Sequence, residues 1–287
     1  MGIDQIRTRL ANQILAKQDS CYRWGFDECL AQQHPEYLYY WPKYRATLWT
    51  LLFLAEIKAP LNLPAIEQAL TLVMNHFFDE ANHIFSLGNS HFPIPCLNGN
   101  LLYLHFNFRQ PHMPQVKSVI EFFSAYQRFD DGDFKTPNSY PYFSNTACYG
   151  KHTCYWGIVK LLKGLSFIPV SERTATDRGL IENCIEFVLH HEVCFQSHHK
   201  DELIHPEIDQ LTFPAIRNDF LEILWLLKRE GVQDPRMMRA ENLLRSKMND
   251  EGEWELERPM TNLIIPAGRK GFPNAFVTER ALEVFDR

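Results

Sequence analysis

Five side chains of the types that bind zinc or act as nucleophiles lie near the starts of apolar segments: Cys96, Cys148, His152, Cys154 and Asp219. Thiolate, imidazole and carboxylate groups are the usual protein ligands of zinc, and the same set also suits iron. A cysteine at a helix N-terminus has a lowered pKa, so a larger fraction of it is the reactive thiolate. The pattern predicts a metal site made of these five residues, with Asp219, Cys154 and His152 as catalytic groups. The alternative is that the cysteines are small buried core residues without chemistry.

A second cluster with possible chemistry is rich in histidine. Five of the 12 histidines lie within residues 190–205. Imidazoles in such a cluster supply metal ligands or a general base, whereas a histidine in an exposed loop is more often only solvated. Both interpretations stay open from the sequence.

Aromatic side chains are frequent, with 21 Phe, 11 Tyr and 6 Trp. Five of them belong to the most apolar helical segments and are predicted to bind a substrate: Trp49, Tyr103, Tyr155, Trp156 and Trp225. Around a cavity they would enclose an apolar ligand or stabilise a cation through their ring faces. For any single one of them, packing in the core between helices is the simpler interpretation.

Composition and charge limit the function class. The chain has 287 residues, is 45% hydrophobic and carries a net charge of −6 without a lysine or arginine run, which argues against an electrostatic nucleic-acid binder. No apolar run reaches the roughly 20 residues of a membrane span, and the longest, residues 48–57, is interrupted by Glu56. Seven cysteines, an odd number, without an export signal indicate free thiols in a reducing cytoplasm.

These groups must be positioned by helices, because most of the chain has helical spacing. Beyond an amphipathic start at residues 1–18, helices are predicted over 46–57, 64–77, 99–108, 116–128, 154–167, 178–193, 219–230, 235–248 and 277–285. They form a repeat of about 55–65 residues, with five apolar second helices that each follow a more polar first helix. Such pairs must stack, as an open solenoid or a closed ring, to bury their apolar faces. In this register Cys96, Cys154 and Asp219 occupy equivalent helix starts.

Two motifs in the repeat resemble a known superfamily. The turns at 127–134 and 247–254 share glycine and an aromatic residue at the same places, and they resemble the QW motif of squalene and oxidosqualene cyclases. Residues 152–163 (HTCYWGIVKLLK) resemble an inner-helix segment of protein prenyltransferase β subunits. Over about residues 40–287 the chain is similar to the terpenoid cyclase/protein prenyltransferase superfamily. More narrowly, CLNGN at 96–100 and CYGKHTC at 148–154 resemble bacterial squalene-cyclase-like or prenyltransferase-like proteins.

The resemblance implies a fold and a site. The fold would be all-α, an α/α toroid of about five to six helical pairs in one domain over 1–287, with 1–40 as a helical lead-in and 41–287 as repeats. Protein prenyltransferases hold zinc at one mouth of the barrel with an Asp-x-Cys pair and a distant histidine, and His152-x-Cys154 falls near that pair. His198 follows a serine, as in the narrower group. The acidic turn at 130–133 has the wrong order for the DxDD proton donor of class II cyclases, and we interpret it as a solvated turn.

Three hypotheses for function follow. The first is a metal-assisted enzyme, with zinc as cofactor, that acts on a large apolar, isoprenoid-like substrate in a central cavity. The second is a non-catalytic toroid that binds a lipid or a protein. The third is a metal-independent terpene cyclase with Asp219 as proton donor. We expect no nucleic-acid partner, and a partner subunit is an open question because protein prenyltransferases require one.

Overall fold

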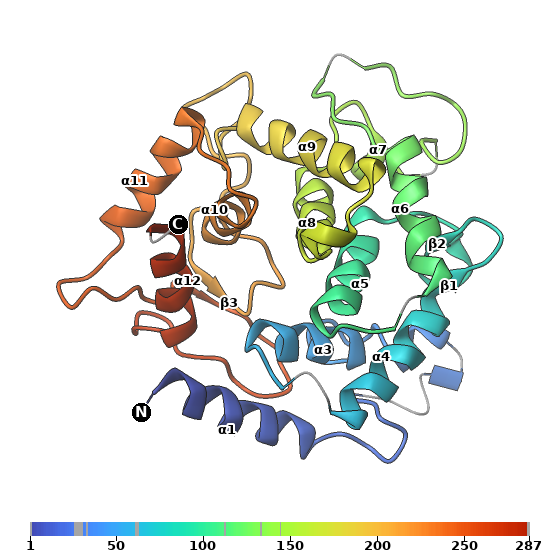
Figure 1. Ribbon diagram of the computed structural model, residues 1–287, viewed down its shortest axis with the longest axis horizontal. Coiled ribbons are helices and arrows are strands. Elements are labelled where there is room, and N and C mark those ends of the chain that lie inside the picture. The colour runs from blue at the N-terminus through green and yellow to red at the C-terminus, as the bar shows by residue number, and fades with distance from the viewer. Residues whose placement is uncertain are drawn as a thin grey trace. The chain divides into compact units, whose positions relative to one another are not determined.

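The computed structural model describes residues 2–25, 31–32, 34–60, 63–111, 113–132, 134–143 and 145–285. Helices dominate these residues, which confirms the all-α prediction (Figure 1). The strands that they contain are four two-residue segments: β1 (Phe78–Asp79), β2 (Ile84–Phe85), β3 (Thr212–Phe213) and β4 (Arg258–Pro259). β1 pairs antiparallel with β2, and β3 pairs parallel with β4. Asp133 of the acidic turn lies outside the described residues.

The helices follow the predicted alternation of first and second helices. The first helices are α1 (Ile3–Leu15), α4 (Pro64–Phe77), α6 (Pro114–Tyr126), α9 (Ala175–His190) and α11 (Met238–Ser246). The second helices are α3 (Thr47–Glu56), α5 (Pro95–Asn107), α8 (Tyr155–Ser166), α10 (Phe220–Arg229) and α12 (Ala275–Phe285). Short elements connect them: α7 (Thr146–Tyr149) and the 3₁₀ turns η1 (Pro35–Leu38), η2 (Gly88–Ser90), η3 (Val170–Glu172) and η4 (Pro235–Met237). In the described part of the chain, five first helices therefore alternate with five second helices.

Burial distinguishes four of the five second helices from the first helices; α12 is the exception, because it buries only Phe276, Val277, Ala281 and Val284. Every residue of α3 is buried, and α5, α8 and α10 are buried over most of their lengths. The first helices bury one stripe each, and in α11 that stripe is Ala240 and Leu244. A helix that is apolar on all sides belongs inside a packed structure, whereas a one-sided helix covers it.

Local sequence explains where these helices begin. α5 and α6 start at a proline, which suits the first helical position because its missing N–H would have no partner there. This places the start of α5 at Pro95, four residues earlier than residue 99 where the apolar spacing begins. α9 starts with a capping box in which Thr174 and Asp177 satisfy each other's backbone N–H groups.

The chain divides into two compact units. Unit 1 contains Met1–Val73 and His205–Arg287, and unit 2 contains Met74–Ile204. In unit 1, α10 packs against α11 and α12, and α1 packs against α3. In unit 2, α5 packs against α8, and α9 packs against α8 and α6 (Figure 1). The single domain and the closed ring that the sequence suggests stay predictions.

The first and last repeats of unit 1 share a structural motif. The indole N–H of Trp24 donates to the Ile14 carbonyl, and that of Trp254 donates to the Leu244 carbonyl, both at 2.8 Å. Each tryptophan is 1% exposed, so each links the end of a first helix to the core. A threonine hydroxyl near the start of the following second helix, Thr278 in the last repeat, accepts the tryptophan backbone N–H.

Glycine brings the backbones of α5 and α8 together in unit 2. A Cβ atom on Gly99 would overlap the backbone of Lys160 and Leu161, and one on Gly164 would overlap the Gly99 carbonyl oxygen. Tyr103 contacts Phe167 one turn further along, with ring centroids 4.7 Å apart. The two helices therefore run parallel, and their N-termini lie at the same end.

None of the helices in the described part of the chain combines the length and the apolar character that crossing a bilayer requires.

Candidate functional site

Asp219 belongs to unit 1, whereas the other four predicted ligands belong to unit 2. Asp219 caps α10: one carboxylate oxygen accepts the Glu222 backbone N–H at 2.8 Å and the other accepts the Thr212 N–H at 2.7 Å. Burial raises the pKa of Asp219 to about 6, although these backbone hydrogen bonds oppose the shift. Both oxygens are thus occupied, and the observed role of the side chain is structural.

The three predicted cysteine ligands come together in unit 2. Cys96 lies in the first turn of α5, Cys148 in α7, and Cys154 is the N-cap residue of α8. The sulfur of Cys154 forms hydrogen bonds with those of Cys148 and Cys96. The parallel packing of α5 and α8 explains this contact, because it brings two helix starts to one place.

His152 is turned to a different set of groups. Its imidazole Nδ1 lies 2.7 Å from a carboxylate oxygen of Asp131, and its hydrogen-bond partner is therefore this carboxylate rather than a cysteine thiol. Within the described residues, no three side chains of His, Cys, Asp or Glu are arranged to hold a metal ion. The zinc ion predicted from the sequence therefore stays a prediction.

The five predicted substrate-binding aromatics separate into two groups. Tyr155 and Trp156 line a pocket in unit 2. The other three are 2–7% exposed and pack in the core: Trp49, Tyr103 and Trp225. The simpler interpretation, core packing, is thus the one observed for these three.

The pocket of unit 2 has a volume of about 460 Å³, within the range of small-molecule sites. Its lining residues are Asp131, His152, Thr153, Tyr155, Trp156, His191, Gln196, Ser197, His198, His199 and Ile204. The aromatic and aliphatic members form an apolar wall, and most of the others carry groups that exchange protons or form hydrogen bonds. His152, Tyr155 and Trp156 were predicted as site residues, and His191, His198 and His199 come from the histidine cluster.

Asp131 is the centre of the polar side of this pocket. One carboxylate oxygen accepts a hydrogen bond from His152, and the other accepts one from the hydroxyl of Ser197. His191 approaches the second oxygen, with Nε2 3.8 Å away. The backbone carbonyl of Asp131 lies 3.3 Å from Nε2 of His198. Four side chains from separate parts of unit 2 therefore surround one residue.

Electrostatics keep Asp131 ionised. Burial by itself would raise the pKa of this carboxyl group, but the hydrogen bonds from Ser197 and His152 outweigh it, so the pKa is lowered. Because an ionised carboxylate only accepts hydrogen bonds, Nδ1 of His152 is its donor nitrogen. With Nδ1 as the donor, Nε2 is the ring nitrogen that can accept a proton, and the His152 side chain is 61% exposed.

His191 is a buried imidazole with one nitrogen unused. Its ring is 3% exposed, and Nδ1 donates to the Phe195 carbonyl oxygen at 3.1 Å. Nε2 is buried and has no hydrogen-bond partner. Burial lowers the pKa of His191 to about 4, although Asp131 opposes the shift, so the ring is neutral near pH 7. Nε2 of His191 thus presents a lone pair to the pocket.

Local backbone structure positions these groups. Asp131 and His152 form an antiparallel bridge, which sets their side chains beside each other. Gly132 follows with φ of +96°, and a Cβ there would meet the ring of His152. A second bridge, Phe195 with Leu203, closes the loop that carries Ser197 and His198.

Sequence reasoning missed the most connected residue of the pocket. The interpretation of Asp131 as part of a solvated turn is wrong, because its side chain is only 14% exposed and accepts two side-chain hydrogen bonds. His191 and Ser197 lay inside the histidine-rich segment but carried no signal that separated them from their neighbours. The one sequence feature that marked this part of the pocket is Gly132, which follows Asp131 in the repeated turn.

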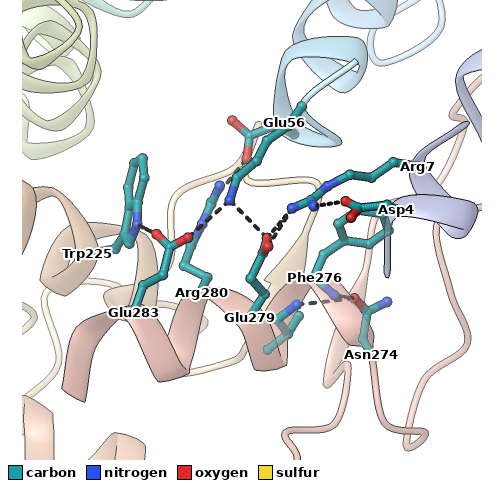
Figure 2. A network of polar contacts seen from close by, with 11 residues as sticks. Asp4, Arg7, Glu56, Trp225, Asn274, Phe276, Glu279, Arg280 and Glu283 are labelled. Atoms are coloured by element: carbon teal, nitrogen blue, oxygen red, sulfur yellow. Dashed lines mark hydrogen bonds and ion pairs between the residues drawn. The ribbon is translucent and has the colours of Figure 1, made fainter. Parts of the chain in front are cut away.

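Unit 1 has a polar network of another kind around α12 (Figure 2). Glu56 is 3% exposed, and its carboxylate pairs with Arg280 at 3.0 Å and accepts the Ala215 N–H. The guanidinium of Arg280 also lies over the ring of Trp225, 4.7 Å from its centroid.

The rest of that network follows one face of α12. Glu279 pairs with Arg7 of α1 and with Lys58, and Glu283 pairs with Lys58 and accepts the indole N–H of Trp225 (Figure 2). The space left beside these groups is about 10 Å³, too small for a ligand. The network therefore joins helices of unit 1.

A comparison of the chain with protein-family models, curated proteins and solved structures finds no match. The function must therefore be argued from the site itself.

Proposed function

We propose that this chain is an enzyme whose reaction takes place in the pocket of unit 2, with His152 as general base and Asp131 as the residue that orients it. The observation that carries the proposal is the set of contacts around Asp131. A carboxylate that fixes the tautomer of a histidine leaves the other ring nitrogen ready to accept a proton. The exposed Nε2 of His152 is that nitrogen.

His191 supports a binding role for a hydroxyl group or a water molecule. Its Nε2 lone pair and an ionised oxygen of Asp131 lie 3.8 Å apart, and both are acceptors. Two facing acceptors are satisfied by a donor between them. A substrate O–H, or a water molecule that attacks the substrate, supplies such a donor. The proposed step is transfer of that proton to His152.

The apolar wall specifies the remainder of the substrate. Tyr155, Trp156 and Ile204 give the pocket an apolar part of its lining beside the groups that can carry charge. An apolar chain with one polar end, such as an isoprenoid alcohol or ester, has this division of character. The closed toroid and the large isoprenoid-like substrate predicted from the sequence belong to this proposal, and the five pairs of helices support the former.

The predicted zinc ion adds a separate proposal. Cys96, Cys148 and Cys154 are the residues that would hold it, and it would supply Lewis-acid chemistry at the thiols. The acid–base step described above uses Asp131, His152 and His191 alone. Elemental analysis of the untagged protein tests the metal independently of any substrate.

The experiment is a substrate screen with matched variants. Wild-type protein is incubated with p-nitrophenyl esters of increasing chain length and with prenyl alcohols, prenyl acetates and prenyl diphosphates. We expect turnover of at least one apolar compound, and a loss of about 10²- to 10⁴-fold in kcat/KM for His152→Asn and Asp131→Asn. His190→Asn and Glu251→Gln are the controls, because His190 is the exposed neighbour of His191 and Glu251 is the exposed repeat equivalent of Asp131, and both lie outside the pocket.

Three outcomes contradict the proposal. Turnover that persists in both pocket variants would place the chemistry elsewhere. Saturable binding of a prenyl compound without any turnover would favour the non-catalytic, lipid-binding hypothesis. Turnover that is lost in Asp219→Asn while His152→Asn stays active would favour the cyclase hypothesis with Asp219 as proton donor.

A further inference from the structure

Unit 2 has a second pocket, which is lined by other residues than the pocket around Asp131. Its volume is about 470 Å³, within the range of small-molecule sites. Its lining comes from α6, from the turn between β1 and β2, and from the segment that follows α6. Three of the lining residues are aromatic and one is acidic: Phe122, Tyr126, Tyr140 and Glu121. Ring faces and a carboxylate are the groups that attract a cation.

The planes of the three rings are inclined to one another. Phe122 and Tyr126 lie one turn apart on the same face of α6, with ring centroids 4.8 Å apart and planes at 41°. The ring of Tyr140 lies 6.2 Å from that of Phe122, with planes at 69°. Phe122 is 8% exposed, whereas Tyr126 and Tyr140 are 40% and 36% exposed. The two tyrosines therefore keep much of their ring surface accessible to a ligand.

A short turn positions Tyr140 beside α6. The backbone N–H of Tyr142 donates to the Ser139 carbonyl oxygen at 2.8 Å, which closes the turn that contains Tyr140. The hydroxyl group of Tyr142 donates to the Tyr126 carbonyl oxygen at 3.0 Å, so this turn is joined to the last residue of α6. A ligand that enters the pocket meets rings that are already in place, and such preorganisation favours binding because little ordering remains to be done.

Negative charge accompanies the rings. Glu121 lines the pocket, and its side chain is 60% exposed and pairs with the exposed Lys117 at 3.6 Å. Because exposed ion pairs contribute little, a ligand cation can share this carboxylate. Asp79 is a second carboxylate of this region. Burial alone would raise its pKa, but hydrogen bonds from Asn82 and His91 outweigh that effect, so the pKa of Asp79 is lowered and the group is ionised.

We propose that this pocket binds a small quaternary ammonium compound of the choline type. A cation within about 6 Å of a ring centroid is attracted to the negative face of the ring. A trimethylammonium group suits such walls because its methyl groups present an apolar surface and it has no N–H groups that require acceptors. Glu121 supplies the opposite charge. The inference is independent of the proposed enzyme function, because other residues line this pocket.

The first test compares ligands of similar shape and different charge. Choline and its neutral carbon analogue, in which a tert-butyl group replaces the trimethylammonium group, are titrated into the untagged full chain in a calorimeter. We expect choline to bind at least about tenfold more tightly, because the analogue lacks the charge that the rings attract. Ethanolamine, a primary ammonium ion with the same alcohol end, should bind more weakly than choline, because its N–H groups lose hydrogen bonds to water among the rings.

The second test places the site. Tyr126→Leu and Tyr140→Leu each remove a ring face and keep an apolar side chain, and we expect each to weaken choline binding by about three- to thirtyfold. Tyr126→Phe keeps the ring and should bind choline as the wild type does. Tyr22→Leu is the matched control, because Tyr22 is a tyrosine of unit 1 with a similar exposure of 42%. Substitutions at exposed side chains cost little stability, so these variants should fold.

Several results would overturn the proposal. Equal affinity for choline and its neutral analogue would make this an apolar pocket without selectivity for charge. Ethanolamine that binds as tightly as choline would make the Glu121 carboxylate, and not the rings, the determinant. Unchanged affinity in both leucine variants would place choline elsewhere, and a wild type that does not bind choline saturably would remove the site. Binding to phosphatidylcholine vesicles without binding to free choline would make the ligand a lipid headgroup.

Discussion

The carboxylates of Glu56 in unit 1 and Asp131 in unit 2 are both largely buried, yet their partners differ in kind. Glu56 faces the guanidinium of Arg280 and a backbone N–H, so its charge is neutralised and its hydrogen bonds are made. Asp131 accepts from His152 and Ser197 and lies near the unpartnered Nε2 of His191. The first arrangement is complete within the protein, and the second needs a donor from outside.

This difference separates a structural role from a functional one. A buried carboxylate paired with arginine resists change, because removing either partner leaves an uncompensated charge. A carboxylate that fixes the tautomer of a histidine leaves the other ring nitrogen available as a base. The empty volumes agree with this distinction between a structural and a functional carboxylate. The space beside the unit 1 network is about 10 Å³, whereas the unit 2 pocket has about 460 Å³. The largest predicted effects test this contrast directly.

Removing the partner of Glu56 should have the largest effect on stability. Arg280→Gln leaves a buried carboxylate without its cation, and we expect a loss of about 3–5 kcal/mol in the free energy of unfolding. Asp131→Asn should cost about 1 kcal/mol or less, because the amide oxygen can still accept one of its hydrogen bonds. Urea unfolding of both variants measures the difference. Equal destabilisation would remove the contrast between the two regions.

The pH dependence of stability should have opposite signs in the two units. His191 keeps its lowered pKa of about 4 only when folded, so the unfolded chain binds the extra proton between about pH 6.5 and 4. Its contribution of about 3 kcal/mol is present above that range and is lost as the pH falls. Asp219 has a raised pKa of about 6, so the folded chain keeps its proton longer. Its contribution of roughly 3 kcal/mol is present below about pH 4 and is lost as the pH rises through 6.

Comparing each variant with the wild type across this pH range isolates the contributions of His191 and Asp219 to stability. Unfolding free energies are measured from pH 4 to 7 for the wild type, His191→Gln and Asp219→Asn. The advantage of the wild type over His191→Gln should shrink toward pH 4, and its advantage over Asp219→Asn should shrink toward pH 7. Parallel curves for either variant would show that the residue titrates normally in the folded chain.

Unit 2 depends on close backbone contact where unit 1 depends on charge. Gly99→Ala should cost about 1–3 kcal/mol, because the new methyl group overlaps the backbone of α8 at Lys160. Gly179→Ala in α9 is the matched control, since no atom lies within 4 Å of the added Cβ, and it should stabilise the chain by about 0.5–1 kcal/mol. Thermal unfolding compares the two. A neutral Gly99→Ala would mean that α5 and α8 pack less closely than observed.

The exposed end of the unit 1 network should contribute least. Lys58 is 47% exposed and pairs with Glu279 and Glu283. Lys58→Met should change the unfolding free energy by less than about 1 kcal/mol, and the change should vanish in 1 M salt. Urea unfolding at low and high salt measures this. A salt-independent loss of several kcal/mol would show that Lys58 acts as a buried ion pair.

Much of the helical structure was predictable, because it depends on neighbours in the chain. Apolar spacing marked the second helices, and the glycine and aromatic residue at 252 and 254 marked the turn that buries Trp254. Proline moved the start of α5 to residue 95, which spacing alone does not show. The register of the repeat also aligned Cys96 with Cys154, whose sulfurs do meet.

The pocket was only partly predictable, because its members come from distant positions. Asp131 receives hydrogen bonds from residues 21 and 66 positions away, and nothing in its own segment separates it from Asp130. Asp219 shares the helix-start position of Cys96 and Cys154, yet its carboxylate is taken up by backbone N–H groups. Equivalent positions in a repeat share backbone geometry and not side-chain partners.

The sequence by itself determined the helices and their alternation along the chain, since these follow from the order of apolar and polar residues. Only the tertiary structure decided which charges neutralise each other and which remain available. Glu56 and Asp131 each carry a carboxylate group, and the sequence does not distinguish their partners. Packing alone brought arginine to Glu56 and histidine to Asp131. The partner of a buried charge is chosen by the folding of distant segments, and that choice separates a structural carboxylate from a reactive one.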